Sequence, residues 1–92
     1  VDPAHFAGGK IRLEPERAAT AVTEVIGTRL ALETDMAAFG IGEIVDENMA
    51  NAARVHAVER GVAVADHTLV AFGGAAPLHA ARLAEKLGIK RI

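Results

Sequence analysis

The first helical pattern along the chain lies between residues 15 and 30. Apolar side chains recur there at i, i+4, i+7 and i+8, at Ala18, Val22, Val25 and Ile26. Glu14-Pro15-Glu16 places negative charge in the first turn, where the helix dipole favours it. The spacing therefore predicts a helix at about 15 to 30. Gly27 is expected to weaken its last turns by up to about 1 kcal/mol relative to alanine.

A second, longer helical pattern follows. Thr34-Asp35 suits its N-cap, and Gly61 suits the position just past its end. Because Gly40 and Gly42 interrupt the pattern, we expect a short helix, a kink or a tight junction near residue 40 and a continuous helix from 41 to 60.

Most of this long helix is apolar. Its apolar line comprises Ile41, Ile44, Val45, Ala52 and Val55, widened by Met49, Ala53 and His56. Its polar stripe comprises only Glu43, Glu47, Asn51 and Arg54. We therefore expect the helix to be buried on most of its circumference, with the stripe exposed. Asn48 falls on the apolar side, where its amide is expected to be buried and hydrogen-bonded to backbone.

The last third of the chain changes pattern. A short apolar run over 68–72 predicts a buried strand, and Gly73-Gly74-Ala75-Ala76 predicts a sharp turn. Pro77 starts a helix over about 77 to 87 that ends at Gly88. This helix turns Ala80, Leu83, Ala84 and Leu87 inward and Arg82, Glu85 and Lys86 outward. Residues 89–92 are expected to start a second, parallel strand.

These elements predict an α/β, mostly helical fold. Residues 1–14 form an irregular lead-in, 15–61 a helical platform and 68–92 a strand-turn-helix-strand unit. The chain has 92 residues, of which 51% are hydrophobic, a share typical of the interior of a larger α/β protein. We therefore expect residues 1–92 to be a single fragment of a larger domain.

Composition also narrows the possible functions. The absence of cysteine removes disulfides and thiolate chemistry and is compatible with the cytoplasm. A net charge of −2, with three phenylalanines and no Trp or Tyr, argues against binding to nucleic acid. The apolar runs are too short to span a membrane. The four histidines are scattered without ligand spacing, so we expect no metal site, and His79 is expected to be structural.

The turn at Gly73, Gly74, Ala75 and Ala76 is the candidate binding site. Four residues with almost no side chain let a ligand or another backbone approach the main chain closely. The first amides of the following helix favour anions such as nucleotides. The same turn also suits a plain connection between a strand and a helix, and its spacing matches neither a phosphate loop nor a full dinucleotide fingerprint.

Several blocks of sequence resemble the hydantoinase A/5-oxoprolinase family, which includes subunits of acetone and acetophenone carboxylases. They cover nearly the whole chain: Asp2-Pro3 and Phe6-Ala7-Gly8-Gly9-Lys10, Asp46 to Ala52, Val58 to Gly61, Leu69 to Ala80, and Leu87-Gly88-Ile89. The block Gly73-Gly74-Ala75-Ala76-Pro77-Leu78-His79 is the most specific of them. Ala76 departs from the family pattern, which usually has glycine there.

The resemblance implies a segment of an actin/hexokinase-like ATPase fold. It implies that Gly73, Gly74, Ala75 and Ala76 lie near the adenosine part of ATP. In the full-length protein, ATP and Mg²⁺ would activate a carbonyl or enol oxygen by phosphorylation, which opens a small cyclic amide. The phosphate loop and the magnesium and substrate residues have no counterpart in these 92 residues, so no catalytic residue is assigned. We expect the fragment alone to bind no cofactor and to be inactive.

Three functions remain open on the sequence. The chain is a segment of an ATP-dependent hydrolase of the hydantoinase or 5-oxoprolinase type, or of the ATP-using subunit of a biotin-independent carboxylase, or a helical packing module that binds nothing. The expected partners are the rest of the parent chain and a second, B-type subunit. The fragment alone is expected to self-associate, as a dimer with possible exchange of a helix or strand about Gly40-Gly42.

Overall fold

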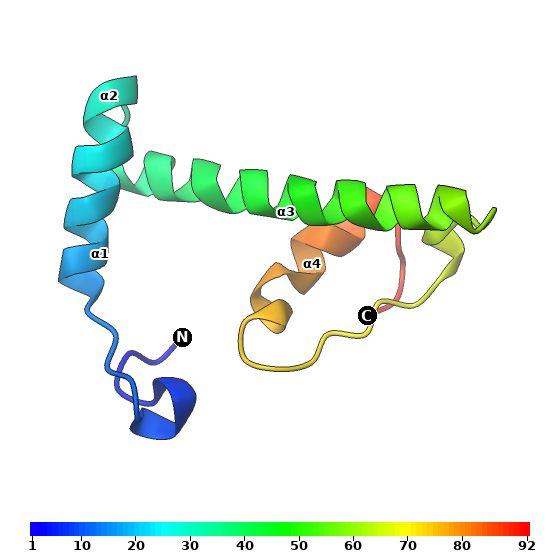
Figure 1. Cartoon of the computed structure of the whole chain (residues 1–92), viewed down its shortest axis with the longest axis horizontal. Coiled ribbons are helices and arrows are strands. Elements are labelled where there is room, and N and C mark those ends of the chain that lie inside the picture. Colours follow the sequence, from blue (N-terminus) through cyan, green and yellow to red (C-terminus); the bar gives the residue numbers. More distant parts are fainter. The chain divides into compact units, whose positions relative to one another are not determined.

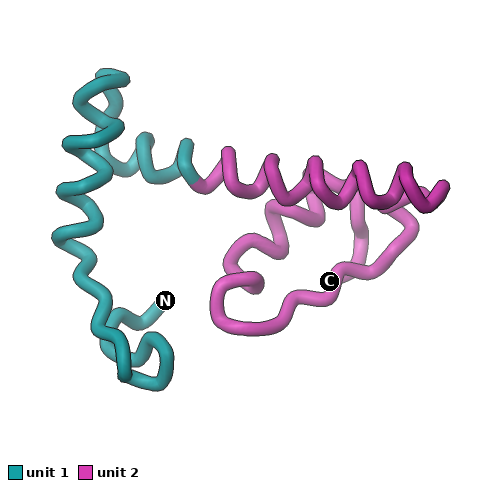
Figure 2. The backbone as a smooth tube through the Cα atoms, viewed as in Figure 1, with its two compact units in different colours: residues 1–41 teal, residues 42–92 magenta.

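The computed structural model describes all of residues 1–92 and is mostly helical, with no strand (Figure 1). Its helices are α1 (Pro15–Val22), α2 (Thr28–Leu30), α3 (Thr34–Glu59) and α4 (Ala76–Leu87), with 3₁₀ turns at Phe6–Gly9 and Val64–Asp66. The chain divides into two compact units, residues 1–41 and 42–92, and the boundary falls inside α3 (Figure 2).

In the first unit, α1 and α2 form one helical stretch joined by a π-helical segment at Thr23–Gly27. The predicted helix over 15–30 is therefore confirmed. Its end is a tight reversal: Ala31 has a left-handed φ of 52°, and the Leu32 amide donates to the Gly27 carbonyl at 2.9 Å. α3 then begins at Thr34, whose hydroxyl lies 2.6 Å from that of Thr23.

Gly27 has a function that the sequence did not reveal. It is buried, and a Cβ built on it would lie 2.9 Å from the Leu32 carbonyl oxygen. That distance is too short for a real contact with backbone, so the reversal after α2 requires glycine at this position.

We predict that Gly27→Ala and Gly40→Ala change stability in opposite directions. Gly27→Ala should lower the free energy of unfolding by about 2 kcal/mol, because its methyl group displaces backbone. At Gly40 an added Cβ has no neighbour within 4 Å. There alanine should raise helix stability by up to about 1 kcal/mol. Urea unfolding followed by circular dichroism measures both, and equal effects would contradict the tight contact at Gly27.

The expected interruption of the long helix is wrong, since α3 is unbroken from Thr34 to Glu59 through Gly40 and Gly42. A glycine inside a helix costs about 1 kcal/mol and does not force a break. The predicted end is confirmed. Gly61 has φ 66°, and the amides of Gly61 and Val62 donate to the carbonyls of Val58 and Ala57, each at 3.0 Å. These are the two bonds of a Schellman motif.

In the second unit α4 packs against α3 through small residues. Ala50 and Ala57 of α3 are buried, as are Ala80, Ala84 and Leu87 of α4. With Leu83 half-buried, the predicted inward face of α4 is confirmed. Its start at Ala76-Pro77 and its end at Gly88, with φ 70°, are also as predicted. Alanine on both helices allows their backbones to approach closely.

The predicted faces of α3 are wrong for most residues, although Asn51 is exposed as predicted. The stripe expected to be exposed supplies Glu43, Glu47 and Arg54, which hydrogen-bond to α4. The expected inner line is instead solvent-exposed, with Ile44 at 64% and Val55 at 58%. Asn48 is also exposed, so the buried amide expected there is absent. The face that packs on α4 instead carries the buried Ala50 and Ala57, and the ion pairs of Arg82 and Lys86 with α3 lie beside it.

The two predicted strands, at 68–72 and 89–92, do not form. The segments touch through one backbone hydrogen bond, from the Leu69 amide to the Arg91 carbonyl at 3.0 Å. Val70 and Phe72 are exposed rather than buried. One bond between two short segments is not a ladder, and a pair of strands without further partners is marginally stable in water. The fold is mostly helical, as predicted, and the strand-helix-strand part of the prediction is not confirmed.

Candidate functional site

The turn at Gly73, Gly74, Ala75 and Ala76 is open main chain at the start of α4. All four residues are exposed. Gly73 has φ 89°, a left-handed conformation that favours glycine, and a Cβ added to Gly73 or Gly74 would have no neighbour within 4 Å. The Ala75 carbonyl accepts the Leu78 amide at 3.0 Å, and Pro77 lies in the first turn of the helix. Nothing in this chain fills the space beside the turn.

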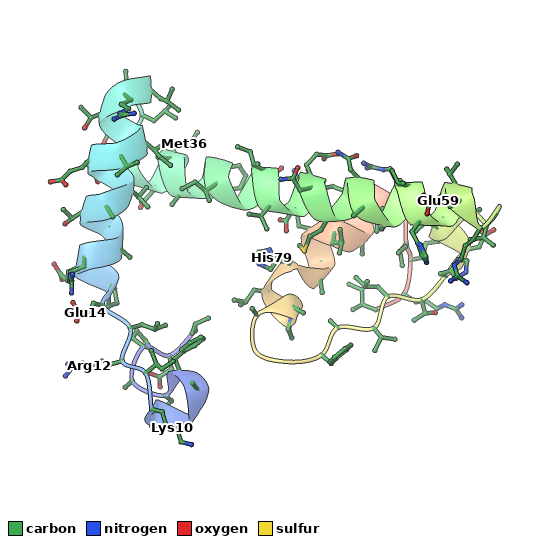
Figure 3. The ribbon with its side chains drawn as sticks, in the orientation of Figure 1. Lys10, Arg12, Glu14, Met36, Glu59 and His79 are labelled. Atoms are coloured by element: carbon green, nitrogen blue, oxygen red, sulfur yellow. The ribbon has the colours of Figure 1, made fainter.

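A part-buried hydrogen bond connects the beginning of α4 to α3. His79 lies in the first turn of α4 (Figure 3), and its Nδ1 is 2.7 Å from Oδ1 of Asp46. Since an ionised carboxylate can only accept, Nδ1 carries the proton that is donated. The Asp46 side chain is 9% exposed and that of His79 is 31% exposed. His79 therefore has the structural role expected of it, with Asp46 as its partner. Their hydrogen bond holds the first turn of α4 against α3.

Asp46 stands in a block that resembles the family, but no role was predicted for it. A signal for it was present: Asp46 shares a row at i, i+4, i+7 and i+11 with Ala50, Ala53 and Ala57. That row of small residues is the face that packs on α4, and Asp46 is the buried charged residue within it. A carboxylate aligned with alanines rather than with Glu43 and Glu47 indicates a buried partner.

A network of ion pairs joins α3 to α4 beside this pair. Glu43 accepts two hydrogen bonds from Arg82, at 2.7 and 2.9 Å, and one from Lys86 at 3.2 Å. Lys86 also donates to Glu47 at 3.0 Å. Arg54 donates to Glu47 at 2.9 Å and to the Lys86 carbonyl at 2.8 Å, so it also satisfies the last turn of α4. Lys86, expected to point outward, is only 15% exposed.

These contacts shift the ionisation of the network. The two hydrogen bonds from Arg82 lower the pKa of Glu43 from 4.5 to about 2. Hydrogen bonds from Arg54 and then Lys86 lower the pKa of Glu47, and the same carboxylates raise the pKa of Lys86. Each shift favours the charged form, so the network holds its charges through the neutral pH range.

We predict a stability loss in acid that depends on Glu43. Because its pKa is lower in the folded chain, its contribution is complete above pH 4.5 and is lost as the pH falls toward about 2. The free energy of unfolding, measured in urea at successive pH values, should fall through this range, and Glu43→Gln should flatten the fall. Glu24→Gln, which alters an exposed carboxylate outside the network, is the control. An unchanged profile in Glu43→Gln would contradict the prediction.

The chain offers no site for a metal ion and no helix long and apolar enough to cross a membrane. No group of three or more His, Asp or Glu side chains converges at ligand distance. The carboxylates nearest to one another, Glu43 and Glu47, are held by Arg82, Lys86 and Arg54.

Comparison with known proteins finds similarity along the whole chain. A family model described as Hydantoinase/oxoprolinase matches residues 1–92. The gamma subunit of acetophenone carboxylase from Aromatoleum aromaticum is 42% identical over 83 residues, which are 90% of this chain and 11% of that protein. The alpha subunit of caprolactamase from Pseudomonas jessenii is 39% identical over 83 residues, again 90% of this chain and 12% of that protein.

A solved structure is similar as well. It is the nucleotide-free structure of acetone carboxylase, from work on ATP-dependent acetone carboxylation. It matches 97% of this chain and 12% of its own, with a TM-score of 0.81 and 29% identity. The chain thus spans about an eighth of the proteins that it resembles.

Proposed function

The chain belongs to the hydantoinase/oxoprolinase family. We propose that it is one segment of an ATP-dependent enzyme that opens small cyclic amides. In this proposal the turn formed by Gly73, Gly74, Ala75 and Ala76 lies beside the adenosine part of ATP. The remainder of a longer chain supplies the catalytic residues. The segment is part of an actin/hexokinase-like ATPase fold.

The observation that carries the proposal is the open space beside the turn. A Cβ added at Gly73 or Gly74 would meet no atom within 4 Å, and all four residues are exposed. A flat nucleoside could therefore lie directly on the main chain. Ala76 adds one methyl group at the edge of this surface, where glycine would leave more room.

The chain's own residues would hold the turn rather than react. The Asp46–His79 hydrogen bond of 2.7 Å fixes the first turn of α4, and the ion pairs of Glu43 and Glu47 fix its far end. Bound ATP would supply a phosphoryl group to activate the substrate oxygen. The donor set here does not fit Mg²⁺, because the clustered carboxylates are engaged with arginine and lysine. Metal and phosphates would be held by other parts of the longer chain.

The comparisons favour one further candidate. Both the 42% identical gamma subunit and the similar solved structure are named as carboxylases of ketones. The segment could thus belong to the ATP-using subunit of such a carboxylase, with the same position for the turn. Two of the relatives are named as subunits, which supports a second, B-type partner subunit in either case. Phosphate release from ATP by the full-length protein distinguishes the two activities. Release that depends on hydantoin or 5-oxoproline indicates the amide hydrolase, and release that depends on a ketone plus bicarbonate indicates the carboxylase.

Gly74→Val in the full-length protein tests the position of the turn. We expect ATP to bind at least about tenfold more weakly, because the branched side chain occupies the space left for the nucleoside. The thermal midpoint without ATP should stay unchanged, since a Cβ at Gly74 meets nothing within 4 Å.

The control for this experiment is Ala81→Val. It adds the same kind of bulk at an exposed residue of α4 and should leave ATP affinity unchanged. Unaltered ATP affinity in a folded Gly74→Val protein would show that the turn is a plain connection in a helical packing module.

A further inference from the structure

A hollow lies in the unit formed by residues 42–92, apart from the turn. It has a volume of about 400 Å³ and is bounded by the last turns of α3, the segment after it and the end of α4. None of Gly73, Gly74, Ala75 and Ala76 lines it. Its size falls within the range of small-molecule sites in proteins.

The wall of this hollow is apolar because small residues of α3 face larger ones of the following segment. Ala53 and Ala57 leave space on the α3 side, and Val62, Leu69 and Leu87 are among the residues that enclose it. The alanines on α3 thus create room for an apolar group of modest size. A ligand that fits must bury an apolar body there.

The polar residues that line the hollow include one cation, Arg60, and no carboxylate. The lining includes Arg60, His56 and His67 and contains no Asp or Glu. The side chain of Arg60 makes no hydrogen bond or ion pair within the chain, as is also true of Arg12, Arg29 and Arg91, but Arg60 is the one of these four that lines the hollow. Glu59, the nearest carboxylate with a contact to the rim, lies 3.9 Å from Nδ1 of His56. An unpaired guanidinium beside an apolar hollow is complementary to an anion with an apolar tail.

Two more polar residues, His67 and Thr68, line the hollow. Nδ1 of His67 lies 2.9 Å from the Ala63 carbonyl, which fixes the ring at the edge of the hollow. The hydroxyl of Thr68, which also lines it, has no partner within the chain and can donate to a bound oxygen. Arg60 and Thr68 thus each bring a polar group without a partner in the chain to the lining of the hollow.

We propose that this hollow binds a small carboxylate with an apolar body, with the carboxylate on Arg60 and the body between Ala53, Leu69 and Leu87. The site is separate from the nucleotide turn and does not depend on the function proposed above.

Three ligands of one shape test the proposal on the 92-residue chain. They are 3-phenylpropanoate, its neutral amide and the cationic 3-phenylpropylamine, each titrated while the methyl NMR signals of the chain are followed. We expect saturating shifts at the alanine and leucine methyls of the hollow, with the acid bound about tenfold more tightly than the amide and the amine bound most weakly. Equal affinity for acid and amide, or shifts away from the hollow, would overturn the proposal.

Two variants separate the charged and apolar parts of the site. Arg60→Gln should reduce the affinity for the acid to that for the amide and leave the amide unchanged. Arg29→Gln, at an exposed arginine of α2, is its control and should change nothing. Ala53→Leu fills the hollow and should weaken acid and amide alike. Because Arg60 is exposed and unpaired, its variant should fold, and undiminished acid binding by it would refute the assignment even if Ala53→Leu fails to fold.

Discussion

His79→Ala should lower the free energy of unfolding by about 2 to 3 kcal/mol, because it leaves the Asp46 carboxylate without its partner. The Asp46 side chain is 9% exposed, so water cannot readily replace the lost hydrogen bond of 2.7 Å. Asp46→Ala should cost less, since the His79 ring is 31% exposed and can turn toward solvent. The order of the two effects follows from burial alone, and urea unfolding measures it.

A double-mutant cycle isolates the bond itself. The variant that carries both substitutions should be little less stable than His79→Ala, which gives a coupling of about 1 to 2 kcal/mol between the two residues. His56→Ala is the matched control, because that exposed ring comes no closer than 3.9 Å to its carboxylate, Glu59. If His79→Ala cost no more than His56→Ala, the pair would not fix the start of α4.

Local signals in the sequence predicted the ends of the helices well. Pro77 at the start of α4 and the glycines at 61 and 88 act within one or two turns of backbone, and the structure has them in these positions. Gly40 and Gly42 led to a wrong prediction of a break in α3. A glycine lowers helix stability by about 1 kcal/mol, and a long helix tolerates that loss without breaking. Gly27 is required because the chain reverses after α2 and brings the Leu32 carbonyl close to it. The apolar pattern of the helix does not predict that reversal.

The face on which α3 packs is not the one that its large apolar residues predicted. Apolar periodicity predicted that Ile44, Val45 and Val55 would lie inward, and all three are exposed. The packed face is the row of small residues that includes Ala50 and Ala57, and its partner α4 lies far along the chain, as in the contact between Arg82 and Glu43, for which |i−j| is 39. For the candidate site, the sequence and the family resemblance supplied Gly73 to Ala76, and the structure added Asp46 as the partner of His79.

The exposed side of α3 leads to the last prediction, which is that the isolated 92-residue chain forms a dimer. Ile44, Val45, Ala52 and Val55 recur along one exposed side of the helix. Asn48, the polar residue among them, carries no charge. An apolar, uncharged surface of this kind on an otherwise charged chain usually contacts a partner. Two copies related by a two-fold axis would cover both surfaces, and because α3 is unbroken, no exchange of helices is required.

Sedimentation equilibrium between 10 μM and 1 mM measures this association, and Val55→Glu tests the surface. A glutamate within the contact would bury a charge without a partner, so the dimer should weaken by at least about a hundredfold. Val25→Glu is the control, at a valine of the first unit that is also exposed, at 59%. A monomer at every concentration would contradict the prediction, and dissociation by Val25→Glu but not Val55→Glu would place the contact on residues 1–41 instead.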